Sequence, residues 1–168
     1  MLQLFNIFWQ ICLLRGVPQQ LPASRFLLVL TLMLHILLDL LFALFTLPLF
    51  HAAAASLFNV ALLFAFIHVL LKLTHKSTRF LQTLTALLGS GLVLGMLALP
   101  LTIWFYSINT PEARLLPSML TLGLIIWGML VTGHILRHAL DVHQSLALLL
   151  AFAYTLLSYN LMGLLFPY

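Results

Sequence analysis

The sequence predicts an all-α integral membrane protein, in which an N-terminal interfacial amphipathic helix precedes a five-helix transmembrane bundle. Of its 168 residues, 64% are hydrophobic and 6% are charged, whereas an ordinary soluble domain is roughly 25% charged. So few charges cannot cover a surface that faces water. Five apolar runs are also long enough to cross a bilayer, which takes about 20 residues. We therefore expect one membrane domain, residues 25–168, after a short N-terminal segment, residues 1–24.

The N-terminal stretch MLQLFNIFWQICLLR is apolar but too short to span a bilayer. Gln3, Asn6 and Gln10 fall on one side of a helix, and Trp9 is a residue that favours the membrane interface. This pattern predicts an amphipathic helix that lies on the membrane surface. Two prolines and a glycine in the connector GVPQQLPAS then end that helix.

The five predicted spans lie near residues 26–50, 53–73, 81–106, 115–136 and 146–166. Only His51 and Ala52 separate the first two runs, which predicts a tight antiparallel hairpin. On the third span, Gly91 and Gly95 form a G-x-x-x-G pair, which we expect to pack closely against another helix of the same chain. Pro100 lies further along this span, where it removes a backbone hydrogen bond and should kink the helix.

The basic residues predict the orientation of the chain. With five spans, six of the seven Lys and Arg residues fall on one side of the membrane, and only Arg114 falls on the other. Together the six are termed the basic rim: Arg15, Arg25, Lys72, Lys76, Arg79 and Arg137. Because cytoplasmic loops are enriched in Lys and Arg, we expect the N-terminus in the cytoplasm and the C-terminus on the opposite side.

Two interpretations of the basic rim stay open. It sets the orientation alone, or it also attracts anionic lipid headgroups or another membrane protein. The net charge of +4 arises from residues between apolar runs, so it does not indicate a nucleic-acid surface. The lipid bilayer is the one partner that the composition itself requires.

The stretch HILLDLL places an acidic residue inside the first span. An Asp at the centre of a helix costs roughly 2.5–3.5 kcal/mol to insert, which the surrounding leucines offset. From the rise of about 1.5 Å per residue, Asp39, Asn59 and Asn160 each lie roughly 20 Å from the cytoplasmic end of their span, so they should share one polar layer. His35 lies one turn nearer the cytoplasm, on the same face as Asp39. We predict a hydrogen bond between Asp39 and an asparagine or Tyr159 on a neighbouring span.

This layer also has two interpretations. In the first, Asp39 with His35 forms a proton or cation site, since intramembrane carboxylates often do. In the second, Asp39 is a neutral, hydrogen-bonded clip between helices, worth about 0.6–2 kcal/mol. The sequence alone does not choose between them.

No pattern indicates a metal, a cofactor or a catalytic residue. The histidines lie in loops or at different depths of different spans, without the spacing of metal ligands, and Cys12 is the only cysteine. No nucleophile stands beside a suitable base. We therefore expect a protein without enzymatic activity.

Two stretches are similar to a known family of membrane proteins. STRFLQTLTALLGSGLVLGMLALPL has a small polar lead, then Phe-x-Gln-Thr, then a span with Gly and Pro, and IIWGMLVTGHILRHAL precedes an Ala-rich last span. With five spans and a cytoplasmic N-terminus, the chain resembles, over roughly residues 25–166, the bacterial relatives of the Yip family, whose eukaryotic members interact with Rab GTPases. The resemblance implies a non-enzymatic protein of a bacterial inner membrane that organises membrane or holds a partner.

We therefore expect a small membrane scaffold or adaptor that acts through its basic rim or its helix surfaces. The alternative is a small transporter or channel subunit that uses Asp39 with His35. A water-filled cavity that reaches Asp39 would favour the alternative, and a dry bundle would count against it.

Overall fold

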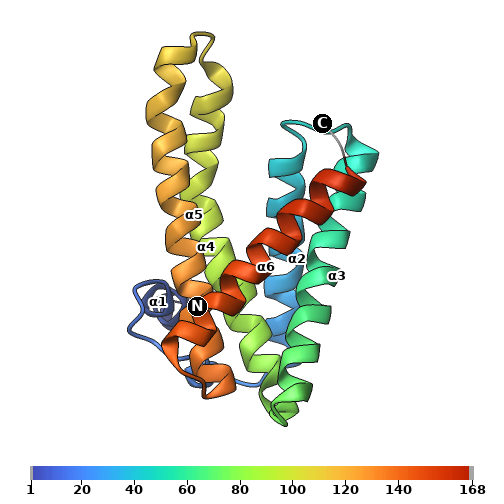
Figure 1. Ribbon diagram of the computed structural model, residues 1–168, viewed down its shortest axis with the longest axis vertical. Helices are drawn as coiled ribbons and strands as arrows, with labels where there is room; N and C mark the ends of the chain where they lie inside the picture. Colours follow the sequence, from blue (N-terminus) through green and yellow to red (C-terminus); the bar gives the residue numbers. More distant parts are fainter. Residues whose placement is uncertain (1, 167–168) are drawn as a thin grey trace.

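The computed structural model describes residues 2–166, and every regular element in this range is helical (Figure 1). In chain order the helices are α1 Leu2–Cys12, α2 Arg25–Ala43, α3 Leu49–Leu73, α4 Phe80–Ser107, α5 Pro111–Leu140 and α6 Gln144–Leu165. Short 3-10 turns at Pro18–Gln20 and Ser77–Arg79 lie in the connections before α2 and α4. The five helices from α2 to α6 are long and apolar enough to cross a membrane. The predicted all-α class is thus confirmed.

The connection between α2 and α3 differs from the predicted one. We expected the first span to run to residue 50 with His51 and Ala52 as the turn, but α2 ends at Ala43 and both residues lie in the first turn of α3. Pro48 explains the difference, because it lacks a backbone N–H and would clash with a preceding helical turn. It takes the N-cap position of α3 with φ −66° and ψ 154°. Asp39 therefore lies one turn from the end of α2 rather than in the middle of a span.

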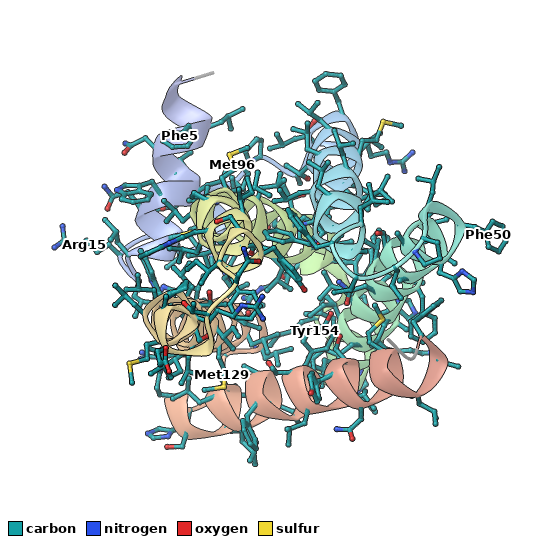
Figure 2. All side chains as sticks on the ribbon, turned by 90° about the horizontal axis from the view of Figure 1, so that it is seen from above. Phe5, Arg15, Phe50, Met96, Met129 and Tyr154 are labelled. Atoms are coloured by element: carbon teal, nitrogen blue, oxygen red, sulfur yellow. The ribbon has the colours of Figure 1, made fainter. Side chains whose placement is uncertain are left out.

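Helices α4 and α5 form a long antiparallel hairpin that extends beyond the α2–α3 hairpin at one end of the molecule (Figure 1). The 28 and 30 residues of α4 and α5 reach about 42 and 45 Å, whereas the 19 residues of α2 reach about 28 Å. Helix α6 runs obliquely across the molecule and packs against both α5 and α3 (Figures 1 and 2). The two hairpins therefore meet at one end and diverge toward the other.

The buried core lies at the end where the hairpins meet. Every residue of the segment Thr83–Ser90 at the start of α4 is buried. Val131, Ile135 and Leu136 of α5 belong to the same apolar cluster. This end of the molecule is close-packed, so it fixes the relative positions of α4 and α5.

Helix α1 docks across α4 and α5 at the packed end, and Figure 2 shows it lengthwise where the hairpin is seen end-on. Phe8, Ile11 and Cys12 are buried there, with the Phe8 ring directly over Gly89. The indole Nε1 of Trp127 donates to the Cys12 carbonyl at 2.7 Å. Burial raises the pKa of the Cys12 thiol to about 11, so the thiol stays protonated at neutral pH. The expected N-terminal helix is present, and one of its faces packs against protein.

Two glycines of α4 allow the close approach of α2. A Cβ added at Gly91 would lie 2.8 Å from His35 Cε1, and one added at Gly95 would lie 2.5 Å from Leu38 Cδ2. The G-x-x-x-G pair therefore faces a helix of the same chain. Further along, α4 continues as a helix through Pro100.

Large apolar side chains cover the outward faces of the five long helices. Phe26, Phe50 and Leu164 are each more than three-quarters exposed, at 76%, 82% and 77%. Such side chains project outward from the helices around the molecule (Figure 2). Contiguous apolar exteriors of this kind suit contact with lipid rather than with water.

Replacing Gly91 by Ala should lower the free energy of unfolding by about 1–3 kcal/mol, because the new methyl group would meet the rigid ring of His35 and push α2 away from α4. Unfolding of the purified protein in detergent micelles would measure the change. Gly123→Ala is the matched control, since a Cβ there meets nothing within 4 Å, and alanine favours a helix over glycine by about 1 kcal/mol. Equal losses in the two variants would contradict the assigned contact.

Candidate functional site

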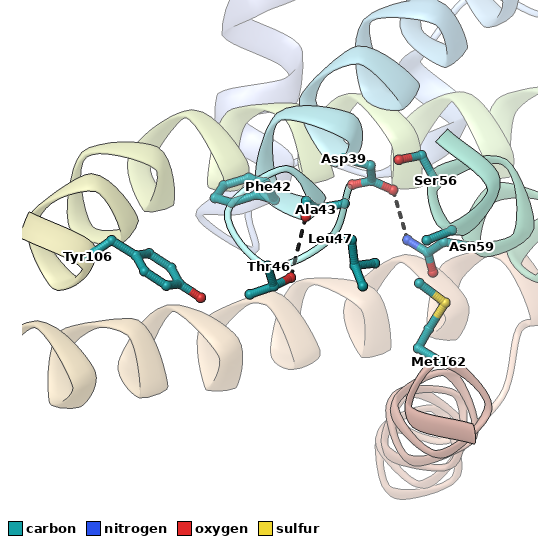
Figure 3. Close-up of a pocket in the computed structure, with 10 residues that line it drawn as sticks. Asp39, Phe42, Ala43, Thr46, Leu47, Ser56, Asn59, Tyr106 and Met162 are labelled. Carbon is teal, nitrogen blue, oxygen red and sulfur yellow. Dashed lines mark hydrogen bonds between the residues drawn. The ribbon is translucent and has the colours of Figure 1, made fainter. Parts of the chain in front are cut away.

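A cleft of about 550 Å³ between α2, α3, α4 and α6 reaches Asp39 (Figure 3). The α2–α3 connection supplies Leu47 to its wall, and α6 supplies Met162. Tyr106, near the end of α4, lines another side and stacks on Phe45 with the ring centroids 5.1 Å apart. The cleft therefore lies at the end of the molecule where the hairpins diverge.

A directed chain of hydrogen bonds holds Asp39 in this cleft. The Ser158 hydroxyl on α6 donates to Asn59 Oδ1 at 3.2 Å, and Asn59 Nδ2 on α3 donates to Asp39 Oδ2 at 2.8 Å. Asp39 Oδ1 makes no hydrogen bond within residues 2–166. The Asp39 side chain is 21% exposed. The chain of hydrogen bonds therefore ends on a carboxylate that has a free oxygen at the cleft.

His35 lies between this carboxylate and the α2–α4 contact. Its Nε2 is 3.7 Å from Asp39 Oδ2, one helical turn away. Its ring packs against Gly91, and its buried Nδ1 has no hydrogen-bond partner among the described residues. A proton on this ring would place a positive charge beside Asp39.

The predicted hydrogen bond to an asparagine is made by Asn59, but Asn160 does not join the layer. Asn160 Nδ2 donates to the Leu156 carbonyl of its own helix at 2.7 Å, and its side chain is exposed. Tyr159 is 75% exposed and also points away. Ser158 takes the inward position instead, and two residues further on a side chain lies about 200° round the helix. Depth along a helix fixes the height of a side chain but not its direction, so the prediction that Asn160 joins the layer is wrong.

Sequence reasoning missed four hydroxyl groups at the cleft: Ser158, and Ser56, Thr46 and Tyr106 on its wall. Ser56 and Asn59 are three residues apart, so the helical spacing alone could have placed them on one face. Thr46 could not be found, because the predicted first span ran through it.

No family model, curated protein or solved structure matches this chain. The Yip resemblance therefore stays a prediction. The cleft and the basic rim are the two surfaces that bear on the role of the protein.

Two members of the basic rim close the end of α5. Lys76 Nζ and Arg79 Nη1 lie 2.6 and 2.9 Å from Asp141 Oδ2. Lys76 also donates to the Leu140 carbonyl at 2.7 Å, and Arg79 donates to the Ala139 carbonyl at 3.1 Å. These carbonyls end a helix, where positive charge is favourable. Lys76 and Arg79 thus join α3 and α4 to α5.

The other four members of the rim are exposed: Arg15, Arg25, Lys72 and Arg137. Arg137 donates to Gln144 Oε1 at 3.1 Å across the α5–α6 turn. The helix ends that carry or adjoin these residues lie at the packed end of the molecule, away from the cleft (Figure 1). The rim and the cleft are therefore separate surfaces.

Replacing Asn59 by Ala should lower the free energy of unfolding by about 1–2 kcal/mol, and Ser158→Ala by about 0.6 kcal/mol, because the first removes both bonds of the chain and the second removes one. Asn160→Ala should stay within about 0.5 kcal/mol of the wild type, since its side chain is exposed. Unfolding in lipid–detergent micelles would give the three values. A loss in Asn160→Ala as large as in Asn59→Ala would contradict the assigned chain.

Asp141→Asn should lower the melting temperature at pH 7 and have no effect in acid. Hydrogen bonds from Lys76 and Arg79 hold the pKa of Asp141 below its ordinary value. A carboxyl whose pKa is depressed by folding contributes stability above its unfolded pKa, and that contribution is lost as the pH falls through the folded value. The difference between the two proteins should therefore shrink below about pH 4. Melting curves from pH 7 to pH 2 would show it, and a difference independent of pH would refute the ion pairs.

Proposed function

We propose that this chain is a non-enzymatic, multi-pass integral membrane protein that binds a cation at Asp39 and acts as a small transporter or channel subunit. The observation that carries the proposal is the cleft that reaches a carboxylate with a free oxygen. A clip that only held helices together would need no such opening. Carboxylates within membrane segments commonly mark paths for ions or protons.

The neighbours of Asp39 support a site rather than a buried clip. Asn59 donates to Asp39 Oδ2, and His35 Nε2 stands 3.7 Å from the same oxygen. The Asp39 side chain keeps about a fifth of its surface accessible, at 21%. A carboxylate that is oriented but still accessible suits reversible binding.

The proposed setting is a bacterial inner membrane with the basic rim in the cytoplasm. Cytoplasmic loops carry an excess of Lys and Arg, and the rim lies at the end of the molecule away from the cleft. The N-terminus is then cytoplasmic, and the C-terminus lies on the opposite side. In this orientation the cleft opens toward the outer leaflet.

Reconstitution into liposomes tests the proposal. Proton and alkali-cation fluxes should exceed those of empty liposomes, and Asp39→Asn should reduce them by about tenfold or more, because a hydrogen bond to a charged group is worth about 1.5–3 kcal/mol. Glu112→Gln removes one negative charge from the exposed start of α5, outside the cleft, and should leave the flux unchanged. If no flux is found, or if Asp39→Asn keeps it in full, the transport role fails.

A Yip-like scaffold or adaptor is the second candidate, because four rim side chains are exposed on a surface distinct from the cleft: Arg15, Arg25, Lys72 and Arg137. This role predicts a stoichiometric partner that co-purifies equally with wild type and with Asp39→Asn. Replacing the four by Gln should then release that partner while flux is retained. The two roles therefore depend on different residues, so variants of Asp39 and of the four rim residues test them separately.

A further inference from the structure

The two aliphatic hydroxyl groups that line the cleft at Asp39 offer hydrogen-bond acceptors to a ligand. The Ser56 hydroxyl donates its hydrogen to the Ala52 carbonyl at 2.8 Å, and the Thr46 hydroxyl donates to the Ala43 carbonyl at 3.3 Å. A hydroxyl has one hydrogen and two lone pairs, so each of these groups can now only accept. Figure 3 shows the Ser56 hydroxyl turned toward Asp39. A ligand in this cleft must therefore donate hydrogen bonds.

The remaining polar groups of the cleft do not change this excess of hydrogen-bond acceptors over donors. Asn59 uses one of its two amide N–H groups on Asp39 and accepts from Ser158 with its oxygen, so this side chain leaves at most one N–H for a ligand. The Tyr106 hydroxyl makes no hydrogen bond with the described residues and can accept as well as donate. An anion would meet the carboxylate at close range, which is unfavourable.

The walls and the size of the cleft suit an organic molecule. Phe42, Leu47 and Met162 form apolar walls beside Tyr106. The volume of about 550 Å³ falls in the usual range of small-molecule sites, about 300–1,000 Å³. Within residues 2–166 no three His, Cys, Asp or Glu side chains come together, so the chemistry at Asp39 suits a single positive group with an apolar body.

We propose that the cleft binds a protonated primary amine that carries a compact aromatic or aliphatic body. The ammonium group donates to Asp39 Oδ1 and to the hydroxyl oxygen of Ser56, while the body packs on the apolar walls. Aromatic rings beside the carboxylate add attraction for a cation. This inference rests on the proposed cation site and names its ligand class.

Equilibrium binding of tritiated 2-phenylethylamine to the purified full-length protein tests the inference. This probe is charged at pH 7, as a lysine side chain is. Saturable binding is expected, weakened by about tenfold or more in Asp39→Asn, since an ionic hydrogen bond is worth about 1.5–3 kcal/mol. Ser56→Ala should weaken it several-fold while leaving the Asp39–Asn59 bond in place. Glu112→Gln is the charge-matched control and should bind as the wild type does.

Competition with two probes of the same body separates charge from hydrogen bonding. 2-Phenylethanol has no charge, and trimethyl(2-phenylethyl)ammonium has charge but no N–H donor. For each of them, the concentration that displaces half of the bound label should be about tenfold or more above that of unlabelled 2-phenylethylamine. If the alcohol competes equally, the cleft binds apolar bodies without regard to charge. If the quaternary ammonium competes equally, hydrogen bonds from the ligand to acceptors of the cleft do not contribute to binding.

The liposome experiment keeps the two proposals apart. Asp39-dependent proton or alkali-cation flux without any binding of 2-phenylethylamine would overturn the amine inference and leave the transport role standing. Amine binding that is lost in Asp39→Asn, with no flux of protons, alkali cations or the amine, would do the reverse. Retention of helical content and of a single elution peak by Asp39→Asn shows that lost binding is not lost folding, because an asparagine can still accept from Asn59.

Discussion

The hydrogen bond from Asn59 to Asp39 is the interaction on which the open end of the structure depends. At the packed end, apolar burial and the cations around Asp141 hold the helices. At the cleft, the polar link between α2, α3 and α6 passes through one side chain, since Asn59 also accepts from Ser158. In a medium of low dielectric such a link is stronger than it would be in water. The position of α6 and the orientation of the carboxylate are therefore coupled.

The cleft exists because the buried small residues of α6 lie at one end of the helix. Ala147 and Ala151 are the buried residues of this helix, and Gly133 of α5 lies against Leu148 at the same level. Helices approach most closely where side chains are small. Beyond Ala151, larger side chains such as Phe152 are exposed, and α6 diverges obliquely toward α3. The space near Asp39 thus begins where the buried alanines of α6 end.

The elements that could be predicted are those determined locally. The sequence predicts the third and fifth spans at 81–106 and 146–166, and the helices are Phe80–Ser107 and Gln144–Leu165, because apolar runs end at polar or turn-forming residues.

The parts that could not be predicted depend on features that hydropathy does not measure. The predicted end of the first span is wrong because hydropathy does not register the missing backbone N–H of Pro48. Counting residues along the spans finds Asn59 but does not exclude Asn160, because the face that α6 turns inward depends on packing against distant residues. The contact of Asp141 with Lys76 and Arg79 also joins distant parts of the chain, and no local sequence pattern predicts it.

The unequal hairpins impose a condition on the surrounding lipid. A hydrocarbon layer about 30 Å thick matches α2 at about 28 Å, but α4 and α5 exceed it by more than 10 Å. Trp104 and Tyr106 near the far end of α4 are residues that settle at headgroup level, with the tip of the α4–α5 hairpin beyond them. Hydrophobic mismatch costs a fraction of a kcal/mol per ångström. In a membrane, the lipid around this protein would therefore not be uniform. Acyl chains beside α2 and α3 would contact shorter helices than those beside α5, and a thicker membrane would disfavour the cleft side first.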